Sequence, residues 1–140
     1  MYAGALGGGP LHDISGRQPD VVGDDPHGAF GQAAAAFGAA VEEPGAMDRL
    51  LPLPFGTMTG RTFLRFAAFD LLLHSWDLSR TLDVELTVPD ELVGPVDHFA
   101  RQVLAGVPRD GVNFAEPVEV AASAPPLERL VAFTGRTPRC

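Results

Sequence analysis

The sequence predicts an all-α protein, and three observations support this fold class. Hydrophobic residues make up 46% and charged residues 20% of the 140 residues, a composition typical of one folded globular domain. Apolar residues recur at helical spacing over 59–82. Residues that favour helix starts and stops bracket three further segments. We therefore expect four helices in a single domain that covers 25–138.

The first 24 residues are expected to form a flexible arm outside that domain. Seven of the residues before Val21 are glycine or proline, and no helical period is visible there. The start also lacks the basic and apolar regions of a signal peptide. The single cysteine, Cys140, leaves no internal disulfide framework. The sequence thus favours a cytoplasmic protein.

Charge and hydropathy disfavour two classes of partner. Ten arginines and no lysines against eighteen acidic residues give a net charge of −8, which would repel a phosphate backbone. The longest apolar run, 63–73, is interrupted by Arg65 and Asp70 and is too short to span a bilayer. We expect neither nucleic-acid binding nor membrane insertion.

The first expected helix covers the alanine-rich stretch 30–41. Asp25 and Pro26 precede it as a plausible cap and first-turn pair. Its large apolar side chains, spaced seven and four residues apart, should form one stripe that faces a partner: Phe30, Phe37 and Val41. After this helix, two prolines within 50–56 exclude a helix, so we expect an apolar linker there.

The strongest helical signal begins at Thr59, a good N-cap, and runs to Leu82. The segment contains no proline, and its only glycine lies at the start. Apolar residues cover most of its circumference, so this helix should be central to the fold. One face is shared by Phe63, Phe66, Ala67, Asp70, Leu73, His74 and Asp77.

Two shorter helices are expected in the second half of the chain. The first covers 89–104, where acidic residues favour the first turn. The second opens at Pro125 and Pro126, runs through Phe133 and is closed by Gly135. Between them, 114–120 alternates like a short extended segment.

The central helix carries the residues that could perform chemistry. Asp70 and His74 are four residues apart, so their side chains point the same way and can either chelate one cation or hydrogen-bond each other. Catalytic zinc sites usually have three protein ligands, so this pair alone is incomplete. Asp77 could orient the His74 imidazole from behind, or it could be a solvated carboxylate.

The other histidines are weaker candidates. His98 is the only histidine of the expected helix 89–104, and we interpret it as an ordinary surface or core residue. His12 and His27 lie in or beside the expected arm, from which either could complete a metal site. No nucleophile triad and no phosphate-binding glycine motif is present in the sequence.

Three segments carry a family resemblance. They are the run from Leu53 to Leu82, which includes DLLLHSWDL, then PDELV, and finally the closing PLERLVAFTGRTP. Over residues 20–138 the chain resembles the actinobacterial DinB-like metal-binding proteins, the group related to mycothiol-dependent maleylpyruvate isomerase. The resemblance implies a four-helix bundle whose divalent metal is held by a histidine of the first helix and by an acid–histidine pair on the third. Asp70 and His74 match that pair.

The resemblance also implies cofactors and a reaction type. The metal would be zinc as first choice, with nickel or iron as alternatives, and the co-substrate a small-molecule thiol such as mycothiol. The activity would be that of a metal- and thiol-dependent isomerase or transferase. Arg80 is a candidate to receive a substrate carboxylate, on the ground of its charge alone.

One departure from the family keeps an alternative open. The family's leading helix, with its metal histidine, is expected to be missing, because the chain begins in what corresponds to the following glycine-rich loop. Such an incomplete bundle would expose an apolar stripe. The alternative function is a non-catalytic homodimer or interaction module, and an inactive remnant is a third interpretation.

Overall fold

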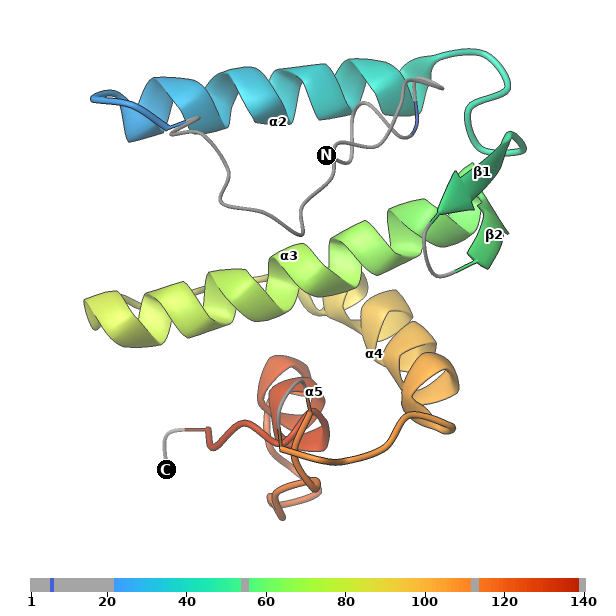
Figure 1. Ribbon diagram of the computed structural model, residues 1–140. Helices are drawn as coiled ribbons and strands as arrows, with labels where there is room; N and C mark the ends of the chain where they lie inside the picture. The colour runs from blue at the N-terminus through green and yellow to red at the C-terminus, as the bar shows by residue number, and fades with distance from the viewer. Residues whose placement is uncertain (1–5, 7–21, 54–55, 112–113, 139–140) are drawn as a thin grey trace. The chain divides into compact units, whose positions relative to one another are not determined.

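A computed structural model describes residues 6, 22–53, 56–111 and 114–138. The described residues are mostly helical, with one two-stranded sheet, which confirms the all-α expectation at this coarse level. The chain divides into two compact units, Met1–Ala67 and Ala68–Cys140. Their boundary lies inside one helix (Figure 1). The expectation of a single domain over 25–138 stays a prediction.

Helix α2 (Pro26–Glu42) lies in the first unit and contains the predicted segment 30–41. The Asp25 carboxylate accepts a hydrogen bond from the backbone N–H of Gly28 at 2.9 Å, as an N-cap does, and Pro26 occupies the first turn. The expectation of a cap and first-turn pair is therefore confirmed.

The predicted apolar stripe of α2 is wrong at one residue. Phe37 and Val41 pack against the core of the first unit, in which Ala40 is buried, but Phe30 is 69% exposed. Seven residues of helix separate Phe30 from Phe37, about 10 Å along the axis. That distance carries Phe30 beyond the apolar cluster that covers the other two side chains.

A β-hairpin stands where the sequence predicted an irregular linker. Strands β1 (Leu50–Leu53) and β2 (Gly56–Thr59) are antiparallel, with Leu50 opposite Thr59. The exclusion of a helix was confirmed, but the pairing of the two strands was not predicted, because prolines count against strands. Pro52 fits because a two-stranded sheet consists of edge strands, where a missing N–H is tolerated. Pro54 lies outside the described residues.

The core of the first unit is a small apolar cluster. Its buried members are Leu6, Ala40, Leu51 and Phe63. Leu6 is completely buried, and its backbone carbonyl accepts a hydrogen bond from the Arg49 guanidinium. One residue of the expected arm thus packs in the core, while 1–5 and 7–21 lie outside the described residues.

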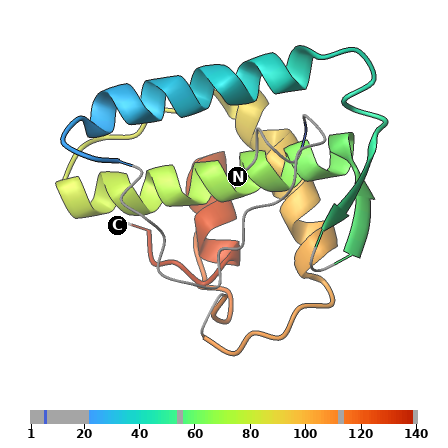
Figure 2. The same ribbon diagram turned by 45° about the horizontal axis from the view of Figure 1, so that its top comes forward.

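The central helix, α3 (Gly60–Leu82), is one uninterrupted ribbon that crosses the boundary between the units (Figure 2). Its start agrees with the prediction, because the backbone N–H of Thr62 donates to Thr59 Oγ1 at 3.3 Å. Phe63, Ala67 and Leu73 are buried.

The second unit contains α4 (Asp90–Leu104) and α5 (Pro126–Phe133), both close to their predicted bounds, and these helices pack against each other. Buried Val93 and Leu130 are among the side chains of this unit's core. The expected extended segment 114–120 belongs to no strand, and its Val118 N–H donates to the Ala132 carbonyl at 2.9 Å. Among the described helices, none is long and apolar enough to cross a membrane.

Candidate functional site

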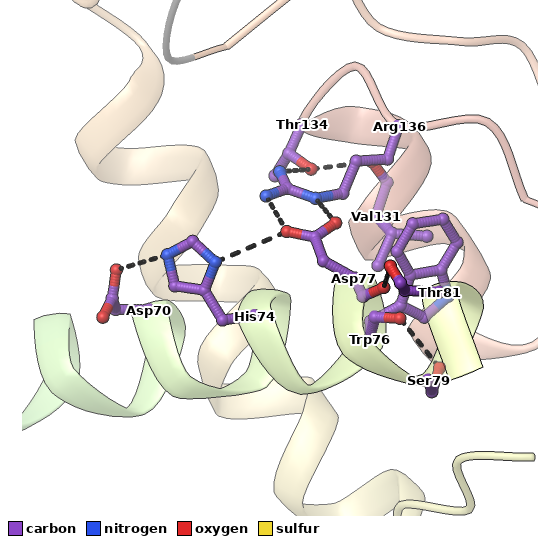
Figure 3. A network of polar contacts seen from close by, with 9 residues as sticks. All are labelled: Asp70, His74, Trp76, Asp77, Ser79, Thr81, Val131, Thr134 and Arg136. Atoms are coloured by element: carbon purple, nitrogen blue, oxygen red, sulfur yellow. Dashed lines mark hydrogen bonds and ion pairs between the residues drawn. The ribbon is translucent and has the colours of Figure 1, made fainter. Parts of the chain in front are cut away.

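Three polar side chains form a row on one face of α3, within the second unit (Figure 3). The His74 imidazole lies between two carboxylates. Its Nε2 is 3.3 Å from Asp70 Oδ1, and its Nδ1 is 3.5 Å from Asp77 Oδ2. The structure therefore brings together the three α3 residues that the sequence singled out, because side chains three and four apart share a helix face.

The row is open to solvent. The side chain of His74 is 68% exposed, and that of Asp70 is 44% exposed. Ion pairs with this exposure contribute about 1 kcal/mol or less to folding, since water and salt screen them. The row is thus accessible to a small ligand and adds little to the stability of the fold.

The separation of the Asp70 and His74 donor atoms fits a shared cation. A hydrogen bond between N–H and a carboxylate oxygen is usually about 2.7–3.2 Å long, so 3.3 Å is at the far limit for a direct bond. Two ligands that each lie about 2.0–2.1 Å from a tetrahedral zinc ion are about 3.3 Å from each other. An imidazole nitrogen and a carboxylate oxygen are also suitable zinc ligands.

Asp77 is held by an arginine from the end of the chain. Arg136 follows α5 and donates from Nε to Asp77 Oδ1 at 2.7 Å and from Nη2 to Oδ2 at 2.8 Å. The hydrogen bonds from Arg136 lower the pKa of the Asp77 carboxyl below its usual value; burial opposes this shift, and the charges of Arg136 and His74 add to it. Asp77 is therefore ionised at neutral pH.

Arg136 is itself fixed by the C-terminal end of α5. Its Nη1 donates to Thr134 Oγ1 at 3.1 Å, and its backbone N–H donates to the Val131 carbonyl at 3.1 Å. Thr134 is buried, and its hydroxyl donates to the same carbonyl at 2.7 Å. Gly135 supplies the positive φ of 88° that turns the chain between these two residues.

A third protein ligand does not join the pair within the part of the chain that the structure describes. Over those residues, no group of three or more His, Cys, Asp and Glu side chains could hold a metal ion. Asp77 contacts the opposite ring nitrogen from Asp70, so one ion cannot bind all three side chains of the row. His98 is exposed on α4.

The two histidines proposed as a third ligand stay predictions. His27 is exposed in the first turn of α2 and belongs to the first unit. His12 lies outside the described residues.

Sequence reasoning missed Arg136 and favoured Arg80. The Arg80 guanidinium lies 5.5 Å from the ring centroid of Trp76, one turn before it on α3, in a cation–π contact. Arg136 is 59 residues from Asp77, so no helical spacing rule links them. The only signal in the sequence is the GRT segment at 135–137, shortly after the last helix, and it belongs to the closing segment that carries the family resemblance.

Comparisons with known proteins give relatives without an assigned function. Two uncharacterised proteins, from two strains of Mycobacterium tuberculosis, are each 33% identical to the chain over 110 residues. The alignment covers 77% of this chain, and the chain spans 60% of the length of these relatives. No protein-family model matches the chain. No solved structure matches it significantly.

Proposed function

We propose that the chain is a DinB-like helical protein in which Asp70 and His74 bind a divalent cation, with zinc as the first choice. The observation that carries this proposal is the 3.3 Å separation between His74 Nε2 and Asp70 Oδ1 on one exposed helix face. That separation equals the spacing of two ligands on one tetrahedral zinc ion, about 3.3 Å, and the two side chains form an ion pair without the ion. The resemblance of DLLLHSWDL to the family's metal-binding helix supports the same pair.

Asp77 has a different part in the proposed site. Its carboxylate faces Nδ1 of His74, the ring nitrogen opposite the proposed metal position. Histidine ligands commonly donate that second N–H to a carboxylate, which fixes the ring and raises the basicity of the ligand nitrogen. Asp77 thus orients the imidazole without binding the ion.

The reaction class follows from the resemblance. A divalent metal of this kind supplies Lewis-acid activation of a small-molecule thiol such as mycothiol, whose thiolate is the nucleophile in isomerase and transferase chemistry. The chain's own residues hold the ion and leave it open to solvent, because both ligand side chains are exposed. With two ligands from α3, further positions stay available for a thiol, for water or for another histidine.

Zinc stoichiometry after reconstitution tests the first step. In equilibrium dialysis against a fixed concentration of free zinc, we expect the wild-type chain to bind about one zinc ion, and we expect His74→Ala and Asp70→Asn to lose it. His98→Ala is the matched control, because it removes an exposed helical histidine outside the row and should leave zinc retention unchanged. Equal zinc content in wild type and His74→Ala would contradict the proposal.

A second candidate function is supported by an exposed leucine stripe on α3. Leu71, Leu78 and Leu82 are 43%, 58% and 60% exposed. They are spaced seven and four residues apart, as in the seam of a coiled coil, about a sixth of a turn around the helix from His74. The alternative is that this stripe pairs with a second copy of the chain and that the protein is a non-catalytic dimer.

Light scattering after size exclusion separates the two functions. A dimer that dissociates on Leu78→Lys, together with no retained zinc in the wild type, would support the interaction module. A monomer that retains zinc would support the metal site.

A further inference from the structure

We infer that Arg136 is a positioning residue for the candidate metal site, where it fixes the His74 imidazole through Asp77. The expected effect of Arg136 on metal affinity rests on the proposed function. It assigns a role in the site to the segment that follows α5, 59 residues from Asp77 along the chain.

The His74 ring needs such an anchor because packing does not hold it. Its side chain is 68% exposed on α3. An exposed side chain exchanges among staggered rotamers unless polar contacts select one of them. The contacts that select the observed orientation are those of Nε2 with Asp70 and of Nδ1 with Asp77.

Asp77 can select that orientation only if its own carboxylate is fixed. Two hydrogen bonds from Arg136, of 2.7 and 2.8 Å, engage both carboxylate oxygens, and such a two-bond pairing constrains the orientation of the carboxylate. The oxygen that faces His74, Oδ2, is the one that accepts from Nη2. The orientation of the carboxylate toward the imidazole is therefore set by Arg136.

Arg136 in turn is attached to a buried part of the second unit. Only 20% of its side chain is exposed, and its guanidinium bonds to the Thr134 hydroxyl, which is buried at the end of α5. The polar contacts thus lead from the buried end of α5 to an exposed imidazole on α3 (Figure 3). Replacing Arg136 should remove the constraint on the orientation of the Asp77 carboxylate. The His74 imidazole should then lose its fixed orientation as a result.

A matched control exists in the same unit. Arg101 makes the same two-bond pairing with Asp97, at 2.9 Å for each bond, but within α4 and in a pair that does not include His74. Arg101→Gln removes an arginine–carboxylate pair of equal geometry. Arg136→Lys keeps the positive charge but cannot donate two parallel hydrogen bonds, so it separates geometry from charge.

The first measurement uses the metal-free chain and NMR three-bond couplings of the His74 side chain, assigned with His74→Gln. In the wild type and in Arg101→Gln, we expect the couplings of one staggered rotamer. In Arg136→Gln, we expect averaged couplings, and in Arg136→Lys an intermediate degree of averaging. Thermal unfolding of each variant verifies that it is folded.

The second measurement is zinc titration by calorimetry. Loss of an outer partner of a metal-binding histidine typically weakens metal affinity 10–100-fold, so we expect a loss of about that size for Arg136→Gln and none for Arg101→Gln. Arg136→Gln with wild-type couplings, or with the zinc affinity of the wild type, would overturn the inference. A wild type that binds no zinc would overturn the proposed function, and the couplings alone would then decide the role of Arg136.

Discussion

Two arginine–aspartate pairs in the second unit have nearly the same geometry but different uses. Arg101 and Asp97 are four residues apart on α4, whereas Arg136 and Asp77 are 59 residues apart on separate elements. Each pair has two hydrogen bonds of 2.7–2.9 Å. The local pair supports a helix that already exists, while the long-range pair orients the carboxylate that faces His74. The comparison shows that the role of an ion pair depends on which further side chain its carboxylate contacts.

The largest expected effect comes from Gly135→Ala, which changes the turn that presents Arg136. Gly135 has a φ of 88°, and an added Cβ would lie 2.7 Å from the Ala115 Cβ and 2.8 Å from its backbone. Strain and overpacking together should lower the free energy of unfolding by about 2–5 kcal/mol. Urea denaturation measures this loss.

Gly38→Ala provides the control for Gly135→Ala. Gly38 lies within α2, and a Cβ added there meets nothing within 4 Å. Alanine should stabilise the helix by about 0.5–1 kcal/mol. Equal effects of the two substitutions would mean that the turn at residue 135 does not constrain the end of α5.

The next largest effect is expected for Thr134→Val, which removes the hydroxyl that anchors Arg136. Thr134 is buried and both donates to the Val131 carbonyl and accepts from Arg136. The Val131 carbonyl keeps its two backbone donors, so the loss should be about 1 kcal/mol, the usual net value of a hydrogen bond. We expect weaker zinc binding than in the wild type but tighter binding than in Arg136→Gln. Unchanged zinc affinity would show that Arg136 needs no anchor at Thr134.

The helices could be predicted from the sequence because their signals are local. The cap at Asp25, the cap at Thr59 and the stop at Gly135 each act within a few residues of the helix end. The hairpin was missed because strand pairing depends on residues that are distant in sequence, and because prolines count against strands. The exposure of Phe30 could not be foreseen, since helical period shows which residues share a face but not how far a core extends.

The candidate site was predictable only in part, for the same reason. The row of Asp70, His74 and Asp77 follows from spacing on one helix. The contact of Arg136 with Asp77 joins two elements whose packing the sequence does not specify. The arginine that the sequence singled out, Arg80, was a candidate for a substrate carboxylate and not for Asp77, and its guanidinium lies over the Trp76 ring.

An effect on stability of similar size, about 1 kcal/mol, is expected for Arg101→Gln, the local member of the comparison. Its pair with Asp97 lies within one helix and is partly exposed, and pairs of this type contribute about 0.3–0.5 kcal/mol. The Arg101 guanidinium also lies 4.4 Å from the Phe133 ring centroid, which adds about 0.5–1 kcal/mol. Thermal unfolding should show a small decrease in Tm. A change in the zinc affinity of this variant would contradict the distinction between the two pairs.

The smallest expected effect is on pH dependence. Arg136 lowers the pKa of Asp77 below the ordinary value of an aspartate, so the unfolded chain binds this proton more readily than the folded chain. The stabilising contribution of the Arg136–Asp77 pair is complete above the ordinary aspartate pKa and is lost as pH falls through the lower pKa of the folded state. Because Asp77 is 39% exposed, solvent screening keeps the contribution small.

Urea denaturation of the wild type and of Arg136→Gln over pH 2–6 measures this dependence. The difference in stability between the two proteins should be constant between pH 5 and 6 and should shrink below about pH 4. A difference that grows on acidification would mean that the carboxylate form of Asp77 is not the partner of Arg136.

Anomalous diffraction at the zinc absorption edge, from crystals grown with zinc, tests the proposed metal site most directly. We expect a peak between the facing atoms of Asp70 and His74, about 2.0–2.2 Å from Nε2 and from a carboxylate oxygen, while Asp77 remains paired with Arg136. A peak on the Nδ1 side of the ring, between His74 and Asp77, or no peak at either side, would contradict it.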